Sequence, residues 1–178
     1  GQNGRQALAS WLAGDSPDKQ KSAVEVLGQL PADQASAVIG EQLPKAKSAA
    51  ALAMLEILAR RGEIRAAGAV AQAASSEDAT VRLAALKALG KAGDESAVPV
   101  LLKTIGAADA EQAQAARASL MSLARGKVTE AIVGAMKSAQ PAVRVELIRV
   151  LVARNAGEAA SAILAETKHA DAAVRQEA

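Results

Sequence analysis

Apolar residues recur along the whole chain at a fixed spacing of 31 residues. Shifting the sequence against itself by that distance aligns five leucines in one column: Leu27, Leu58, Leu89, Leu120 and Leu151. A second column holds Leu8, Ile39, Val70, Leu101, Ile132 and Ile163, and a third holds Ala23, Met54, Ala85, Ala116 and Leu147. A fixed period of this length is typical of proteins built from stacked repeats. We therefore expect one structural repeat for every 31 residues.

Each repeat has the pattern of two helices. In residues 78–108 the apolar positions from Val81 to Leu89 follow the three-and-four spacing of one helix face. Asp78 stands where a carboxylate can accept hydrogen bonds from the free amides of the first turn. After a glycine-rich turn, a second helix begins near residue 97, and Pro99 is tolerated in its first turn. Neither helix can bury its apolar stripe alone, so the pairs must stack on one another.

The period divides the chain into full and partial repeats. Residues 4–13 match a second helix alone, and residues 171–178 match only the start of a first helix. The full repeats span residues 16–46, 47–77, 78–108, 109–139 and 140–170. We expect a single solenoid over residues 1–178. Because both ends fall inside repeats, we also expect the chain to be part of a longer protein.

The composition favours helices and excludes some kinds of site. Hydrophobic residues make up 51% of the chain but aromatic residues only 1%, so Ala, Leu, Val and Ile must fill the core. Alanine favours helices and is depleted in strands. The chain has no cysteine, which excludes disulfides and thiolate metal sites. No apolar run approaches the roughly 18 residues of a membrane span. A net charge of +2 is weak support for a polyanionic partner.

The stretch "DATVRLAALKALGKAGDESAVPVLLKTI", residues 78–105, resembles a HEAT repeat, in particular the short bacterial type of phycobilisome-lyase-related proteins. The resemblance is partial in residues 140–164 and 171–178, whereas residues 16–30 and 47–62 keep the apolar columns but lose the Val-Arg pair. It implies an all-α fold: an armadillo-like α-solenoid, a right-handed superhelix of stacked antiparallel helix pairs. First helices would lie on its convex side, and second helices would line its concave side.

The same resemblance implies a structural role for a recurrent acidic and basic pair. Asp78 and Arg82 stand four residues apart, so their side chains lie on one face of a helix and can pair. Asp171 and Arg175 repeat the pair, whereas Arg144 keeps only the arginine. In HEAT-like repeats such residues resemble a ladder of polar contacts that ties each repeat to the next.

Arg117 departs from the apolar pattern. The other repeats place apolar residues in its column, namely Val24, Leu55, Leu86 and Ile148. One explanation is that the aliphatic stem of Arg117 runs along the core while its charge reaches water. The other is that this first helix shifts in phase, so that Leu120, Met121 and Leu123 enter the core. We favour the phase shift, with a shortened turn before Gly126.

No group of residues indicates catalysis, and we expect no enzyme activity, cofactor or metal. His169 is the only histidine, in a turn between two helices. We interpret it as a solvated loop residue and not as a general base or metal ligand. A helical-repeat metalloenzyme similar to deoxyhypusine hydroxylase would need several His-Glu pairs, and the chain has none.

We expect the concave surface to be the binding face. Its outward positions on the second helices are Ala37, Gly68, Pro99, Glu130 and Ser161, followed one turn later by Glu41, Gln72, Lys103, Gly134 and Ala165. The predicted contacts are Glu41, Gln72, Pro99, Lys103 and Glu130. Either a ligand approaches the backbone closely over these small residues, or the face is a spacer. Trp11, the only large aromatic anchor, is expected to pack against a preceding repeat.

Three functions are consistent with these observations. We favour a non-catalytic interaction or scaffold module of a larger, bacterial, multidomain protein, whose partner is another protein or another domain of the same parent. The resemblance also admits an enzyme subunit related to bilin lyases, although the repeat itself does not carry a reaction. The third is a nucleic-acid-binding solenoid with basic residues along one edge: Arg60, Arg61, Arg65, Arg125, Lys127, Arg154 and Lys168. Phe and Tyr, which would stack on bases, are absent, so nucleic acid is not the expected partner.

Overall fold

The computed structural model describes residues 2–107 and 109–178, and the regular elements of these ranges are all helices. Residue 108, the predicted end of the third full repeat, lies outside the described ranges. The chain divides into two compact units, unit 1 (Gly1–Gly93) and unit 2 (Asp94–Ala178). The boundary falls between the two helices of the predicted repeat 78–108.

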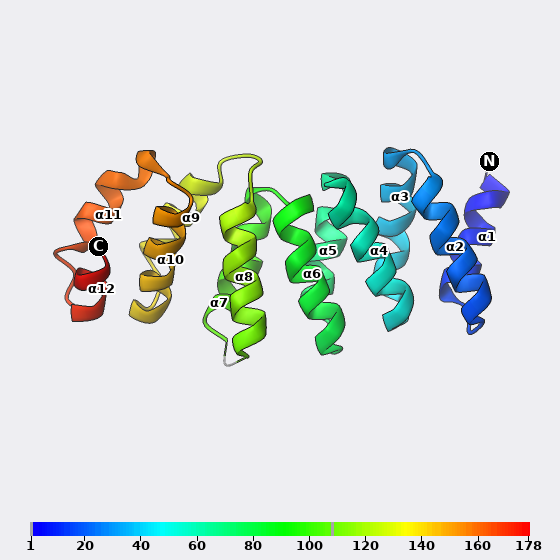
Figure 1. Ribbon diagram of the computed structural model, residues 1–178, viewed down its shortest axis with the longest axis horizontal. Coiled ribbons are helices and arrows are strands. Elements are labelled where there is room, and N and C mark those ends of the chain that lie inside the picture. Colours follow the sequence, from blue (N-terminus) through cyan, green and yellow to red (C-terminus); the bar gives the residue numbers. More distant parts are fainter. Residues whose placement is uncertain (1, 108) are drawn as a thin grey trace. The chain divides into compact units, whose positions relative to one another are not determined.

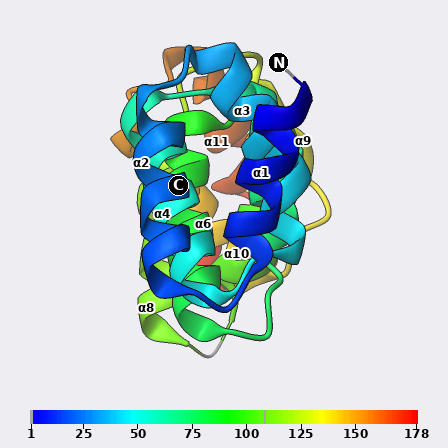
Figure 2. The same cartoon turned by 90° about the vertical axis from the view of Figure 1, so that its right-hand side faces the viewer.

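Unit 1 consists of two layers of helices. Its elements are α1 (Gln2–Ala13), α2 (Pro17–Gln29), α3 (Ala32–Gln42), η1 (Leu43–Lys45), α4 (Ser48–Arg61), η2 (Ile64–Ala66), α5 (Ala67–Ala73) and α6 (Ala79–Ala92). The first helices of the repeats stack as α2 on α4 and α4 on α6, and the second helices stack as α1 on α3 and α3 on α5 (Figure 1). Figure 2 shows α2 and α4 on one side of this unit and α1 and α3 on the other.

Unit 2 has the same layered plan. Its elements are η3 (Glu95–Ala97), α7 (Val98–Ile105), α8 (Ala110–Ser122), α9 (Val128–Met136), α10 (Pro141–Ala153), η4 (Gly157–Ala159), α11 (Ala160–Glu166) and α12 (Ala172–Glu177). The first helices α8, α10 and α12 stack in order, and α7 packs against α9. Stacked helix pairs in each unit confirm the α-solenoid that the sequence predicts.

The predicted columns form the core. All five leucines of the first column are at most 1% exposed, and the third column is fully buried. In the second column, Leu8 is 8% exposed and Ile163 is half-buried, whereas the four members between them are fully buried. The 31-residue period therefore places equivalent side chains at equivalent depths.

The structure contradicts the phase shift predicted around Arg117. Ala116 and Leu120 are fully buried in their expected columns, so helix α8 stays in register. Met121, which the shift would bury, is 37% exposed, whereas Leu123, directly after the end of α8, is 1% exposed as predicted. Nε of Arg117 instead lies 2.6 Å from a carboxylate oxygen of Glu146 on the neighbouring first helix α10. The charge is thus matched at the core boundary, which explains why the helix need not rotate.

The first helices begin at equivalent positions. The residue directly before each of them falls in one column: Ser16, Lys47, Asp78, Asp109, Gln140 and Asp171. Those whose side chains accept a hydrogen bond from a first-turn amide are Ser16, Asp78, Asp109 and Asp171. These bonds satisfy backbone donors that have no partner inside the helix. The predicted capping role of Asp78 is confirmed.

The first helices end in two different ways. After α4 and α10 the chain turns through a left-handed residue, Gly62 with φ 63° or Asn155 with φ 53°. After α2, α6 and α8 it continues in an extended conformation, at Leu30 with ψ 151°, Gly93 with ψ 173° and Leu123 with ψ 119°. A left-handed ending turns the chain so that following amides reach the last carbonyls, whereas an extended ending leaves more of these carbonyls to other donors.

Candidate binding surface

The outer face of the second helices is exposed at every predicted position. In unit 1 these positions are Ala37 and Glu41 on α3 and Gly68 and Gln72 on α5. In unit 2 they are Pro99 and Lys103 on α7, Glu130 and Gly134 on α9, and Ser161 and Ala165 on α11. The opposite sides of these helices carry the buried column from Ile39 to Ile132. The second helices thus present both short and long polar side chains outward, and the role of this face in binding stays a prediction.

Two of the predicted contacts have polar neighbours. Gln72 and Asp78 line one hollow of about 370 Å³ in unit 1, together with Ser48 at the start of α4. In unit 2 a carboxylate oxygen of Glu130 lies 3.3 Å from Nζ of Lys127, and both side chains are exposed. An exposed pair of this kind contributes little stability, so both groups remain able to meet a ligand.

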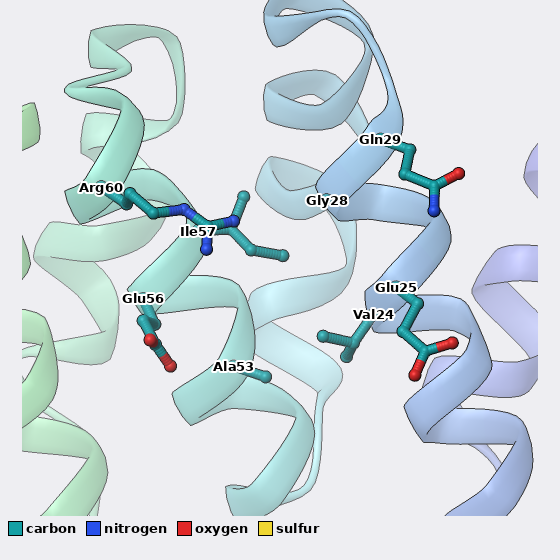
Figure 3. Close-up of a pocket in the computed structure, with 8 residues that line it drawn as sticks. All are labelled: Val24, Glu25, Gly28, Gln29, Ala53, Glu56, Ile57 and Arg60. Atoms are coloured by element: carbon teal, nitrogen blue, oxygen red, sulfur yellow. The ribbon is translucent and has the colours of Figure 1, made fainter.

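A groove of about 350 Å³ runs between α2 and α4 in unit 1 (Figure 3). Val24 and Ala53 face each other across it, and the Arg60 side chain extends over Ile57 toward α2. Gly28 widens the groove because it has no side chain. Glu25 and Glu56 occupy equivalent places on the two helices. The groove therefore combines the apolar side chains of Val24, Ala53 and Ile57 with two carboxylates and the guanidinium group of Arg60.

Asp78 links two successive repeats. Its carboxylate accepts hydrogen bonds from the amides of Thr80 and Val81 in α6 and from the hydroxyl of Ser48 in α4. The hydroxyls of Ser48 and Thr80 and the Thr80 amide hold the pKa of Asp78 well below its usual range. The Asp171 carboxylate accepts hydrogen bonds from the two equivalent amides at the start of α12. The two aspartates therefore fix where a first helix begins.

Arg82 and Arg175 fold back onto the turn that precedes their own helix. Nη1 of Arg82 donates to the carbonyl oxygens six and five residues upstream, at 2.7 and 2.8 Å. Nη1 of Arg175 donates to the equivalent two oxygens at 2.8 and 2.6 Å. Gln20 stands in the same column, and its Nε2 donates to the carbonyl oxygen of Gly14, also six residues upstream, at 2.6 Å. This role of Gln20 was not predicted, although Gln20 stands in the same column as Arg82 and Arg175.

Two arginines at first-helix ends reach back to the preceding repeat. Nη1 of Arg61, at the end of α4, donates to the carbonyl oxygen of Leu30 at 3.0 Å, and Nη2 donates to that of Gly28. Nη1 of Arg154, after α10, donates to three carbonyl oxygens at the end of α8, at 2.6, 3.2 and 2.6 Å. Partial burial lowers the pKa of Arg154, while nearby Glu158 opposes this effect. Both arginines cover the carbonyls of an extended helix ending, a role not predicted from the sequence.

Arg144 makes a shielded ion pair inside its own repeat. Its Nη1 donates to both carboxylate oxygens of Glu166 on α11, at 2.7 and 2.9 Å. The two side chains are only 12% and 11% exposed. Nη2 also donates to the carbonyl oxygen of Lys137, in the turn before α10, at 3.0 Å. Arg144 thus holds its turn as Arg82 does and also joins α10 to α11. Tying of successive repeats by these arginines, as in a ladder, stays a prediction.

His169 has a structural partner in the turn before α12. Its Nδ1 accepts a hydrogen bond from the amide of Asp171 at 3.0 Å, and the ring is half-buried. Among residues 2–107 and 109–178, no three His, Asp or Glu side chains gather closely enough to hold a metal ion. None of the helices in these ranges is both long and apolar enough to cross a membrane.

Known proteins with a similar sequence pattern or fold point to one architecture. The family model described as HEAT repeats matches residues 37–124. The fold resembles the crystal structure of an engineered protein at a TM-score of 0.50 and 19% identity, covering 98% of this chain and 93% of that one. It also resembles a designed armadillo repeat protein in complex with a (KR)4 peptide, at a TM-score of 0.51 and 14% identity, covering 96% and 94%. No curated protein sequence matches the chain. With its 31-residue columns and stacked helix pairs, the chain is a HEAT-like repeat protein.

Proposed function

We propose that the chain is a non-catalytic interaction module that binds a segment of another polypeptide on the outer face of its second helices. HEAT and armadillo repeats generally mediate protein interactions, and the designed armadillo protein of similar fold carries a bound peptide. The observation that carries the proposal is the exposure of small residues at successive second helices. Gly68 on α5 and Gly134 on α9 both have open space where a side chain would begin.

Small residues favour a particular kind of ligand. A peptide backbone can approach a helix closely where no side chain intervenes, and long side chains at the margins can then supply hydrogen bonds and charge. Around Gly68 the nearby polar group is Gln72, whereas Gly134 lies one turn from Glu130. The mixed charge of Glu41, Lys103 and Glu130 favours a ligand that carries both signs. An extended segment of another protein has these properties.

The edge arginines give less support to a nucleic-acid partner. The guanidinium groups of Arg61 and Arg154 already donate to backbone carbonyls of the preceding repeat. Phosphate binding would require them to exchange these bonds for phosphate oxygens, at the cost of leaving the carbonyls without donors. A protein ligand requires no such exchange.

The proposal can be tested with a displayed peptide library. Binders are selected on the whole chain, and their affinities are then measured for variants Gly68→Gln and Gly134→Gln. Each substitution places a flexible side chain where the ligand would approach, and we expect binding to weaken by at least about tenfold. Gly28→Gln is the matched control, because Gly28 also has open space at its Cβ position but lies on the first helix α2.

Two results would count against this function. If the selected peptides bind both second-helix variants with the same affinity as the unaltered chain, the binding site lies elsewhere. Failure to select any binder with an affinity better than about 1 mM would leave the face without a ligand of the proposed class.

A further inference from the structure

The groove between α2 and α4, which we call the α2–α4 groove, carries charged side chains without partners. Its charged lining residues are Glu25 on α2 and Glu56 and Arg60 on α4. Within residues 2–107 and 109–178, these three side chains form no hydrogen bond or ion pair. Glu56 and Arg60 stand four residues apart, a spacing that favours an ion pair on a helix, yet Arg60 extends over Ile57 toward α2 (Figure 3). Two carboxylates therefore remain free at the groove, against one guanidinium group.

Unit 2 places an ion pair at the equivalent positions. Three repeats later, Arg117 on α8 stands in the column of Val24, and Glu146 on α10 stands in the column of Ala53. The Nε atom of Arg117 and a carboxylate oxygen of Glu146 are 2.6 Å apart. Glu146 also pairs with Arg149 at 3.0 Å. The α2–α4 groove has apolar residues in these two columns, so it lacks the ion pair that joins α8 to α10.

The apolar part of the groove is open because two side chains of α2 are small. In the next repeat, Leu55 takes the place of Val24, and Ala59 takes the place of Gly28. Leu55 is 1% exposed, whereas Val24 is half-buried. The smaller valine and glycine leave room for the groove of about 350 Å³. Both of its walls are first helices of unit 1 that pack on each other.

We propose that the α2–α4 groove docks an extended segment of a partner protein with the pattern basic-x-apolar-x-basic. Alternate residues of an extended segment point to the same side, so these three side chains face the groove together. The apolar side chain packs on Val24, Ala53 and Ile57. The two basic residues, about 13 Å apart in an extended segment, reach Glu25 and Glu56 on helices whose axes lie about 8–10 Å apart.

Charge and burial together favour this partner. Each free carboxylate gains an opposite charge, and the attraction strengthens where the apolar side chain excludes water from the groove. The aliphatic stems of the basic residues also cover apolar surface at the margins. This surface is distinct from the second-helix face, because α2 and α4 lie on one side of unit 1 and α1 and α3 on the other (Figure 2).

The sequence argues against a second copy of the chain as the occupant. The pattern basic-x-apolar-x-basic occurs in it once, at residues 87–91, "KALGK". That stretch lies inside helix α6, and its apolar residue, Leu89, is fully buried. A second copy would have to unfold this helix in order to bind. The occupant is therefore a different polypeptide.

A dye-labelled peptide with the sequence Gly-Arg-Ser-Leu-Ser-Arg-Gly is the probe, and its fluorescence anisotropy is measured as the whole chain is added. We expect saturable binding with a dissociation constant below about 1 mM at low salt. Binding should weaken as the ionic strength rises, because the two carboxylates are exposed. A peptide with glutamate in place of both arginines should not bind, and one with serine in place of leucine should bind at least about fivefold more weakly.

Variants locate the binding. Glu25→Gln and Glu56→Gln each remove one charge with little change in size, and each is expected to weaken binding by about threefold to fivefold. The double variant Val24→Arg with Ala53→Glu reproduces the ion pair of unit 2 inside the groove, and we expect it to weaken binding by at least about tenfold. Asp33→Asn is the matched control, because it removes an exposed carboxylate of unit 1 outside the groove. Circular dichroism checks that each variant is folded.

Four results would overturn the proposal. Absence of saturable binding up to about 1 mM means that the groove does not accept such a segment. Equal binding by the two glutamine variants and the unaltered chain places the peptide elsewhere. Weaker binding to Gly68→Gln or Gly134→Gln places the peptide on the second-helix face. If the chain self-associates without peptide, and the two glutamine substitutions together abolish this in sedimentation, the occupant is a second copy. Failure here leaves the second-helix face untouched, since its own test uses the glycine variants.

Discussion

Replacing Arg61 by Met tests how much stability a first-helix arginine contributes through its hydrogen bonds to the preceding repeat. Helix α2 ends in an extended conformation, and the next residue, Pro31, has no N–H with which to cover its carbonyls. Arg61 supplies donors to the carbonyl oxygens of Leu30 and Gly28 from one repeat further along. Methionine keeps most of the aliphatic stem and removes the guanidinium group, with both its donors and its charge.

The expected loss follows from those two hydrogen bonds. A hydrogen bond from a charged donor contributes about 1.5–3 kcal/mol, but water can reach these partly buried carbonyls and replace part of it. We therefore expect Arg61→Met to lower the free energy of unfolding by about 2 kcal/mol. At an m-value of about 1.5 kcal/mol/M, the urea midpoint would fall by about 1.3 M.

Trp11 fluorescence during urea unfolding is the assay, because this single tryptophan reports on unit 1, which contains Arg61. The matched control is Arg60→Met, one residue earlier on α4, where the side chain is exposed. We expect the control to change stability by less than about 0.5 kcal/mol. Equal effects of the two substitutions, or a loss below about 0.5 kcal/mol for Arg61→Met, would refute the reasoning.

Four further predictions concern the start of a first helix, two glycines and one shielded ion pair. Asp78→Asn should lower the free energy of unfolding above about pH 4. The difference from the unaltered chain should shrink as the pH falls, because a carboxylate with a lowered pKa loses its stabilising effect when it is protonated. Urea unfolding at several pH values measures this difference. Gly134→Ala should stabilise by about 0.5–1 kcal/mol in thermal unfolding, since its Cβ meets open space within a helix. Gly126→Ala should destabilise in the same assay, since φ is +74° and the new Cβ would collide with the Glu95 carboxylate. Arg144→Met should cost about 3–5 kcal/mol because it leaves the shielded Glu166 charge without its partner, and adding Glu166→Gln should recover part of that loss.

The fold was predictable because its signal repeats. The five leucines of the first column are buried as predicted, since a solenoid gives every repeat the same neighbours. Arg117 was mispredicted because a single column cannot show that Glu146, on the next first helix α10, supplies an opposite charge. Gln20 was not predicted because it carries no charge, yet its neutral amide donates a hydrogen bond to the turn as the arginines of its column do.

The candidate surfaces were only partly predictable. Every outward position of the second helices proved exposed, because helix periodicity alone decides which side faces the core. The hollow lined by Leu8, Trp11 and Val26 was not predicted, although Trp11 was expected to pack against a preceding repeat. Which residues of α1 and α2 line one hollow depends on how the helices pack, and the sequence does not give that directly.

The two kinds of helix ending make the order of the repeats significant. An extended ending at Leu30 or Leu123 is followed, one repeat later, by an arginine that covers its carbonyls. Insertion of a foreign repeat between such neighbours would separate donor from acceptor, even if every apolar column were kept. Duplication or deletion of both repeats together would preserve the contact. During evolution or engineering of this array, repeats 16–77 and 109–170 should therefore be gained or lost as adjacent pairs.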